Sequence, residues 1–245
     1  MEPGSLSDIE LYFSPKVSEQ QILVEGEECH HIKDVMRHEN GDEIFVTNGL
    51  GSIYRTKIES IDSKKISCKI IEEKNYPNQY SNFTFCIPRL RTADRFEFAL
   101  EKCVELGITN FIVFDSQRTV AKGEKLDRWQ KILISAMKQS LRAWLPSISY
   151  YKSIADLLKL NGEKIFLDQN ANKSLKSILN SQLSTLNYFF IFGPEGGFSK
   201  EELRIMPIGR QVAHGELRVK LTDNRLRSET AIVTAAALLV NSLNN

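Results

Sequence analysis

The stretch FGPEGGFSKEEL runs from Phe192 to Leu203, between an apolar run and a charged one. Three glycines and one proline fall within five residues, Gly193 to Gly197. Glycine lets a ligand approach the backbone closely, and proline stiffens a turn. Ser199 and Glu202 form an S-x-x-E capping box, which predicts that a helix begins just after Ser199. The glycine-rich loop is therefore expected to lead into a helix.

The residues before this loop predict a buried parallel strand. The run YFFIF, Tyr188 to Phe192, has almost no polar side chain, as expected of a strand covered on both faces. Ligands bind beyond the carboxyl ends of such strands, so the loop is a candidate site. An ordinary tight turn would also use Gly and Pro, and composition alone leaves both interpretations open. The spacing is neither G-x-G-x-x-G nor a Walker loop, and the chain has no G-x-S-x-G elbow.

Strands and helices alternate from residue 83 onward. Further strands are expected at 83–88, 111–116 and 164–168, and helices at 94–107, 127–145 and 175–183. The first of these helices places one apolar face inward, made by Phe96, Ala99, Leu100, Cys103 and Val104. Such alternation predicts a mainly parallel sheet with helices on both sides.

The first 75 residues follow a different pattern. Strands are expected at 42–48, 52–61 and 65–73, with one short helix at 28–37. This pattern indicates a small barrel or a β-sandwich. The polar stretch from Asn75 to Asn82, which contains Pro77, is the best linker candidate. The predicted domains are therefore residues 1–75 and 82–245.

Composition excludes several classes of protein. The 245 residues are 42% hydrophobic and 26% charged, which is typical of a soluble globular chain. Neither a membrane helix of ~20 apolar residues nor a secretory signal is recognisable, so we expect a cytoplasmic protein without a membrane partner. The four cysteines are scattered and form no C-x-x-C pair, which predicts free thiols and no metal site.

Charge is distributed unevenly along the chain. Residues 1–75 carry nine Lys and Arg against 15 Asp and Glu, whereas the remainder carries 23 against 16. A basic C-terminal part is typical of proteins with a polyanionic partner.

A second informative stretch, ELRVKLTDNRLRSETAIVTAAALLVNSL, runs from Glu216 to Leu243. It predicts a short strand, a polar loop and a long apolar helix. Arg225 and Arg227 stand beside Glu229 at the expected helix start, where ordinary ion pairs at a capped helix are the simplest interpretation. The alanines of TAAALLV would let another helix approach closely, such as one from a second subunit.

Together, GPEGGFS and RLRSETA resemble the bacterial 16S ribosomal RNA (uracil-N3)-methyltransferase family, of the SPOUT class. Segments upstream are similar as well: HIKDVMRHENGDEI (His31 to Ile44), DRFEFALEKCVELGI and SAMKQSLRAWLP (Ser135 to Pro146). The resemblance covers nearly the whole chain. It implies an RNA-binding, PUA-like β-barrel over residues 1–75 and a trefoil-knotted α/β domain over residues 82–245. It also implies a homodimer through the C-terminal domain, S-adenosylmethionine as cofactor, and methylation of uridine N3 in 16S RNA of the small ribosomal subunit.

The resemblance also assigns residues to roles. Cofactor contacts are expected at Leu167, Gly193, Pro194, Glu195, Gly196, Gly197, Leu217, Leu221, Asn224 and Leu226. Arg227 is the first candidate for stabilising charge on the base, and Arg225 the second. Either Glu229 or Glu195 would act as the base or orient an arginine. RNA contacts are expected at Lys33, Arg37, Arg89, Arg91, Arg95, Arg118, Gln139 and Arg142.

Two departures and three alternatives remain open. Thr222 stands where the family usually has glycine, and Lys138 replaces a frequent glutamate. A knotted enzyme for transfer RNA or another ribosomal position would share these motifs. A non-catalytic RNA-binding or ribosome-assembly protein would bind no cofactor. A nicotinamide-dependent oxidoreductase is disfavoured because G-x-G-x-x-G is absent.

Overall fold

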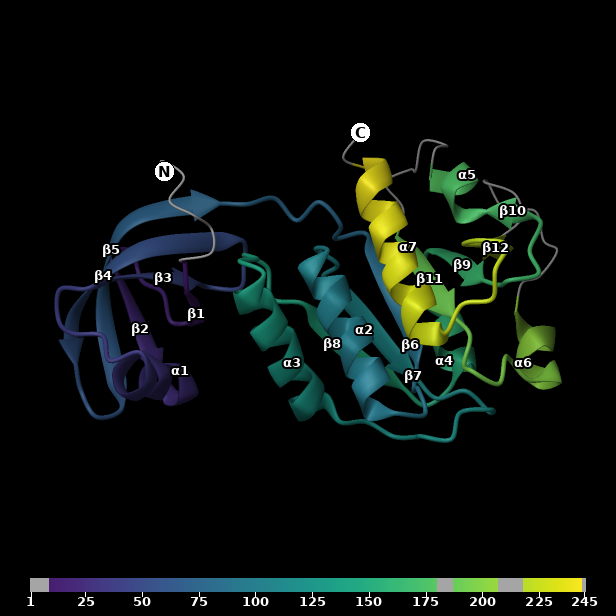
Figure 1. The fold of residues 1–245 in the computed structure, drawn as a ribbon, viewed down its shortest axis with the longest axis horizontal. Coiled ribbons are helices and arrows are strands. Elements are labelled where there is room, and N and C mark those ends of the chain that lie inside the picture. Colours follow the sequence, from purple (N-terminus) through teal and green to yellow (C-terminus); the bar gives the residue numbers. More distant parts are fainter. Residues whose placement is uncertain (1–8, 180–186, 207–217, 244–245) are drawn as a thin grey trace. The chain divides into compact units, whose positions relative to one another are not determined.

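A computed structural model describes residues 9–179, 187–206 and 218–243 (Figure 1). The chain divides into two compact units. The first comprises residues 1–79 and 134–145, and the second comprises residues 80–133 and 146–245.

The first unit contains a curled five-stranded sheet (Figure 1). Its strands are β1 (Leu11–Phe13), β2 (Gln21–Glu25), β3 (Glu43–Thr47), β4 (Ser52–Ile61) and β5 (Lys65–Asn75), in the order β1-β3-β4-β5-β2. The three strands expected from the sequence are present, and β1 and β2 were missed. Between β2 and β3 lie the α-helix α1 (Gly26–His30) and the π-helical turn η2 (His31–Val35), close to the predicted helix.

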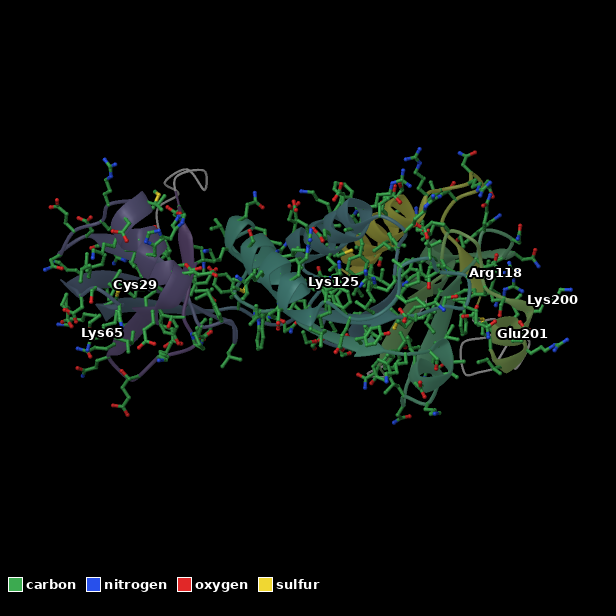
Figure 2. All side chains as sticks on the ribbon, turned by 90° about the horizontal axis from the view of Figure 1, so that it is seen from below. Cys29, Lys65, Arg118, Lys125, Lys200 and Glu201 are labelled. Carbon is green, nitrogen blue, oxygen red and sulfur yellow. The ribbon has the colours of Figure 1, made fainter. Side chains whose placement is uncertain are left out.

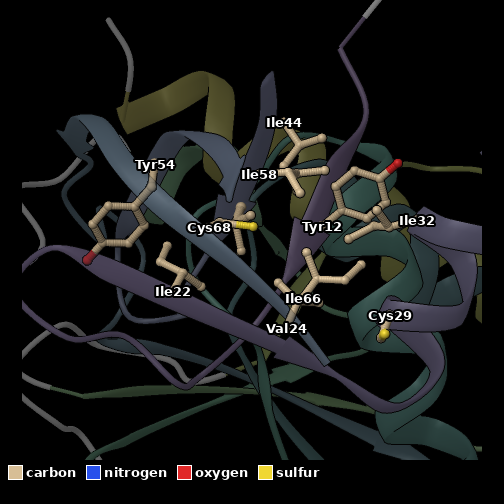
Figure 3. Packing of buried hydrophobic residues seen from close by; sticks show 11 residues of the cluster. Tyr12, Ile22, Val24, Cys29, Ile32, Ile44, Tyr54, Ile58, Ile66 and Cys68 are labelled. Carbon is tan, nitrogen blue, oxygen red and sulfur yellow. The ribbon is translucent and has the colours of Figure 1, made fainter. Parts of the chain in front are cut away.

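Alternate side chains of these strands form the core of the first unit (Figure 3). Successive residues of a strand point to opposite faces, so one set from each strand is buried. The core includes Ile22, Val24, Ile44, Tyr54, Ile58, Ile66 and Cys68, with Cys29 and Ile32 from the helical turns. Burial raises the pKa of the Cys68 thiol to about 11, which keeps it protonated at neutral pH. All four cysteines are buried and unpaired.

Residues 134–145 also belong to the first unit. Leu145 N donates to Gly49 O at 2.9 Å, and Trp144 Nε1 donates to Tyr76 O at 2.8 Å. The helix predicted for residues 127–145 is shorter, because α3 spans Leu126–Gln139. Leu141 adopts a left-handed φ of 53°, which a continuous α-helix does not allow. The predicted domain boundaries did not assign residues 134–145 to the first unit.

The second unit is built on a seven-stranded, entirely parallel sheet, as the alternation of elements predicted. Its strands are β6 (Phe83–Pro88), β7 (Asn110–Phe114), β8 (Ser147–Tyr151), β9 (Glu163–Leu167), β10 (Lys173–Ser174), β11 (Tyr188–Phe192) and β12 (Arg218–Lys220). The order is β10-β12-β9-β11-β6-β7-β8. The sequence analysis missed β8, an edge strand without fully buried residues, and the two-residue β10.

Helices cover both faces of this sheet. They are α2 (Ala93–Glu105), α4 (Ile154–Leu158), α5 (Leu175–Leu179), α6 (Lys200–Ile205) and α7 (Ser228–Leu243). Helices α2 and α7 lie side by side (Figure 1), and α4 contacts α6. The rest of the helix predicted for 175–183 lies outside the described residues. No helix in the described part of the chain is long and apolar enough to cross a membrane.

The strand order brings β9, β11 and β12, which are separated in the chain, next to one another, since β12 pairs with β9 and β9 pairs with β11. Because the sheet is parallel, the loops after these strands lie at one edge, where ligands bind in open α/β folds. Residues 207–217, which precede β12 in the chain, lie outside the described residues.

Candidate active site

A cavity of about 1030 Å³ opens at the carboxyl ends of β9, β11 and β12. Three segments far apart in the sequence line it: residues 166–170, 192–198 and most of 221–229. Its volume is close to the upper end of the range typical of small-molecule sites. The fold therefore brings residues from both quoted stretches, Phe192 to Leu203 and Glu216 to Leu243, together around one cavity.

Nine of the ten expected cofactor contacts line this cavity. They are Leu167, Gly193, Pro194, Glu195, Gly196, Gly197, Leu221, Asn224 and Leu226. The tenth, Leu217, lies outside the described residues. The three loops inferred from the resemblance thus lie around one space.

The loop over residues 193–198, called the cofactor loop because the resemblance predicts cofactor contacts there, is a tight turn. Gly197 N donates to Pro194 O at 2.8 Å, and Gly197 has a left-handed φ of 69°. A Cβ at Gly197 would meet no atom within 4 Å, so the conformation itself favours glycine there. At Gly193 a Cβ would lie 3.4 Å from the Phe198 ring. The protein's own geometry thus explains Gly197, whereas a Cβ at Gly193 would make close but ordinary contact with Phe198.

Neighbouring segments hold this loop. Arg118 Nη1 donates to Gly196 O at 3.0 Å, and Arg91 N donates to Glu195 Oε1 at 3.0 Å. The capping box is present: Ser199 N donates to Glu202 Oε2 at 2.7 Å, and Glu202 N donates to Ser199 Oγ at 3.1 Å. The predicted start of α6 is therefore confirmed.

The third cavity segment accommodates Thr222 without a glycine-like backbone. Among the described non-glycine residues, only Arg37 and Leu141 have a positive φ. Thr222 Oγ1 accepts a hydrogen bond of 2.8 Å from Asn224 N, which closes a local turn. Threonine therefore stabilises the path of this loop by its own side chain.

One ion pair at the cavity was not anticipated. Asp168, directly after β9, pairs with Arg218 on β12, and both residues line the cavity. Asp168 N also donates to Val219 O at 2.8 Å. Since 50 residues separate the two partners, only the pairing of β9 with β12 brings them together.

The catalytic candidates Arg225, Arg227 and Glu229 all line the cavity. Arg95, which we expected to contact RNA, lines it too. Its Nε lies 3.5 Å from Glu229 Oε1, and the Glu229 side chain is only 12% exposed. Arg225 and Arg227 have no ion-pair partner among the residues that the structure describes. Their charges are therefore available to a ligand, whereas the Glu229 carboxylate is paired.

The other expected RNA contacts have different environments. Arg91 is exposed, and Arg118 is exposed beside Gly196. Four belong to the first unit, where all of them are exposed: Lys33, Arg37, Gln139 and Arg142.

Arg89 is an exception, because it is buried and 7% exposed. Its guanidinium carbon lies 5.0 Å from the centre of the Trp129 ring, and Nη1 donates to Gly123 O at 2.8 Å. Burial lowers the pKa of Arg89. The structure thus corrects the expectation of a surface contact: Arg89 holds the backbone of the loop after β7.

The second departure, Lys138, has a clear partner within the first unit. Its Nζ lies 2.5 Å from Glu28 Oε1, and both side chains are largely buried. A lysine here neutralises a carboxylate that would otherwise be buried without an opposite charge. No group of three or more His, Cys, Asp or Glu suited to a metal ion occurs in the described ranges.

Comparisons with known proteins place this fold and cavity in a class. Family models described as "RNA methyltransferase domain" and "RNA methyltransferase PUA domain" match residues 78–240 and 24–71. A probable rRNA-methyltransferase from Porphyromonas gingivalis matches with a TM-score of 0.80 and 25% identity, over 96% of this chain and 99% of its own. A Neisseria gonorrhoeae ribosomal RNA small subunit methyltransferase E bound to S-adenosyl methionine has the same fold, with a TM-score of 0.77 and 23% identity over 94% of this chain and 95% of its own. The fold and site define a SPOUT-type RNA methyltransferase with an N-terminal PUA domain.

Sequence relatives define the family more closely. The ribosomal RNA small subunit methyltransferase E of Aquifex aeolicus is 34% identical over 90% of this chain and 93% of its own length. The Bacillus subtilis protein of the same name is 28% identical over 88% of both chains. The chain therefore belongs to the ribosomal RNA small subunit methyltransferase E family.

Proposed function

We propose that this protein transfers a methyl group from S-adenosylmethionine to N3 of one uridine in 16S ribosomal RNA. The observation that carries the proposal is the cavity at the carboxyl ends of β9, β11 and β12. In a chain of this family, the cavity collects nine of the ten positions at which cofactor contacts were expected.

The cavity residues fit such a cofactor. The backbone of the cofactor loop faces the space with little side-chain cover, and Gly197 leaves room beside it. Apolar side chains such as Leu221 and Leu226 can pack against an adenine ring, while backbone groups bind its polar edge. The bound cofactor would supply an electrophilic methyl group on sulfur.

The arginines of the cavity would act on the base. Loss of the N3 proton places negative charge on the uracil ring, which Arg227, with Arg225 as second candidate, would stabilise. Glu229 is paired with Arg95, since its Oε1 lies 3.5 Å from Arg95 Nε, so its carboxylate already has a cationic partner. Glu229 therefore orients Arg95 in this proposal rather than accepting the proton. Glu195, with one carboxylate oxygen bound by Arg91 N, stays a candidate base.

The RNA must offer the target base unpaired. Uracil N3 lies on the pairing edge, so the nucleotide is either single-stranded or flipped out when it reacts. The exposed side chains of Arg91 and Arg118 lie in the loops after β6 and β7, both of which hydrogen-bond to the cofactor loop, and they suit phosphate contacts. Lys33 and Arg37 are candidates for contacts by the PUA domain.

The biological context belongs to the same proposal. We infer that the substrate is the small ribosomal subunit in the cytoplasm and that the enzyme works as a homodimer through its C-terminal unit. Phe98 on α2 and Leu243 on α7 are 47% and 41% exposed, and they are candidates for that contact. Light scattering on the purified protein tests the dimer, and a monomer at micromolar concentration would contradict it.

Methyl transfer from labelled S-adenosylmethionine to small subunits that lack the modification tests the function. We expect label on one uridine, located by mass spectrometry of nuclease fragments, with no label on transfer RNA. Label on transfer RNA or at another ribosomal position would favour the alternative of a knotted methyltransferase with a different RNA substrate. Absence of both transfer and cofactor binding would favour a non-catalytic assembly protein.

A further inference from the structure

Glu202, in the first turn of α6, is a buried carboxylate outside the set of residues that line the cavity. It is 3% exposed and accepts three hydrogen bonds. The donors are Ser199 N at 2.7 Å, Ser116 Oγ at 2.8 Å and Gln117 N at 2.9 Å. Burial of a carboxylate is unfavourable unless such donors replace water, so this arrangement is specific.

Capping of α6 explains only one of these bonds. The capping box needs the bond from Ser199 N, and a glutamate at the surface could make it. The bonds from Ser116 and Gln117 join α6 to the loop that follows β7. Because β6 lies between β7 and β11, hydrogen bonds of the sheet do not connect the loops after these two strands. The side chain of Glu202 connects them.

The loop after β7 is itself held in place, so it can serve as an anchor. Thr119 Oγ1 donates to Ser116 O at 2.7 Å, close to its start. Gly123 is fixed from two directions: its N donates to Asp115 Oδ2 at 3.1 Å, and its O accepts from Arg89 Nη1 at 2.8 Å. The loop is thus held by a hydrogen bond near its start and, at Gly123, by bonds to the residues that directly follow β6 and β7.

The same anchor reaches the cofactor loop at a second point. Arg118 Nη1 donates to Gly196 O at 3.0 Å, and a Cβ on Gly196 would lie 3.4 Å from Arg118 Cβ. The link at Gly196 and the link at Glu202 bracket residues 197–201. A segment held at both ends loses less conformational freedom when a ligand binds, which favours tighter binding.

We infer that Glu202 is a positioning residue for the cofactor: through Ser116 and Gln117 it holds the loop at residues 193–198 in its binding conformation. Glu202 acts through the backbone of that loop and touches neither the reacting atoms nor the cavity. This inference rests on the proposed function, because it assumes that the loop binds S-adenosylmethionine.

The substitution Glu202→Gln tests the inference. Glutamine keeps one acceptor oxygen but turns an NH₂ donor toward donors, so at least one of the three bonds is lost. We expect the dissociation constant for S-adenosylmethionine, measured by calorimetry on folded protein, to rise about tenfold. We expect kcat at saturating cofactor to stay within about threefold, since reactant positioning by the arginines is unchanged. The matched control is Glu201→Gln, an exposed carboxylate one residue earlier (Figure 2), which should leave the dissociation constant unchanged.

Two further variants separate the bridge, which is the pair of bonds from Ser116 and Gln117 to Glu202, from the capping box of α6. Ser116→Ala removes one bridging donor and keeps the capping box, so it should weaken cofactor binding by a few-fold. Ser199→Ala removes the acceptor for Glu202 N and keeps the bridge, so it should lower the melting temperature without changing cofactor affinity. Unchanged affinity in both Glu202→Gln and Ser116→Ala would overturn the inference.

The remaining outcomes are also decisive. Weaker binding in Ser199→Ala but not in Ser116→Ala would reduce Glu202 to a capping residue. If Glu202→Gln does not fold, Ser116→Ala decides alone. Failure of the unchanged protein to bind S-adenosylmethionine would instead overturn the proposed function, and the inference with it.

Discussion

Arg227 lies at the start of α7 without an ion-pair partner among the described residues, whereas Arg95 and Arg218 each have a carboxylate partner. We therefore expect Arg227→Ala to lower kcat by roughly 10²–10³, as loss of one donor to a developing oxyanion does. Steady-state methyl transfer with labelled cofactor measures this change. Arg204→Ala, on the exposed side of α6, is the control and should keep full activity. Equal activity of the two variants would remove Arg227 from the mechanism.

Gly197 is the residue at which the cofactor loop most requires glycine. An L-residue in the left-handed region costs about 1–2 kcal/mol, and the open space around its Cβ offers no compensating contact. We expect Gly197→Ala to lower the free energy of unfolding by that amount and to weaken cofactor binding. Urea unfolding and calorimetry measure the two effects. Gly196→Ala, whose φ is not positive, should cost less, and the reverse order would contradict this account.

At the scale of elements, the turn between β3 and β4 is shaped by residues 134–145. A Cβ on Gly51 would lie 2.6 Å from a carbon of the Trp144 ring, and φ there is 104°. Gly51→Ala therefore adds a clash to backbone strain, and we expect it to lower the free energy of unfolding by about 1–3 kcal/mol more than strain alone. The control is Gly41→Ala, where φ is 99° and the nearest atom is 3.9 Å away. Denaturant unfolding of both variants measures the difference, and equal destabilisation would show that Trp144 gives way.

At the scale of the whole molecule, charge is divided between an acidic stretch, residues 1–75, and a basic remainder. We expect RNA affinity to fall as salt is raised, with a log–log slope of about −0.7 for each phosphate neutralised on single strands. Arg91→Gln removes one exposed guanidinium and keeps the backbone N–H that binds Glu195. It should make the slope shallower by about 0.7–1, measured by filter binding across a salt series.

The control for this prediction lies in the acidic stretch. Lys65 is 58% exposed at its side chain, on β5 (Figure 2). Lys65→Gln should leave the slope unchanged. An equal loss of slope in both variants would contradict the prediction, because Lys65 is not among the expected RNA contacts.

The sequence by itself determined the class of fold and the loops that line the cavity. Alternation of apolar runs with turn residues predicted the parallel sheet, because a strand buried on both faces has no polar positions. Two motifs, GPEGGFS and RLRSETA, predicted which loops form the site, and twelve of their fourteen positions line one cavity. Local signals such as the Ser199–Glu202 capping box were readable because their partners lie three residues apart.

Only the tertiary structure decided what depends on residues distant in sequence. The pair of Asp168 with Arg218, and the bridge from Glu202 to Ser116, exist because the strand order brings separate loops together. Arg89 was expected to contact RNA because arginine suits phosphate recognition, but packing against Trp129 buries it. The end of α3 at Gln139 was likewise not predicted, because the positive φ of Leu141 ends the helix and because Trp144 and Leu145 form hydrogen bonds with the distant Tyr76 and Gly49. Burial and long-range pairing are properties of the folded chain, so no local pattern of residue types encodes them.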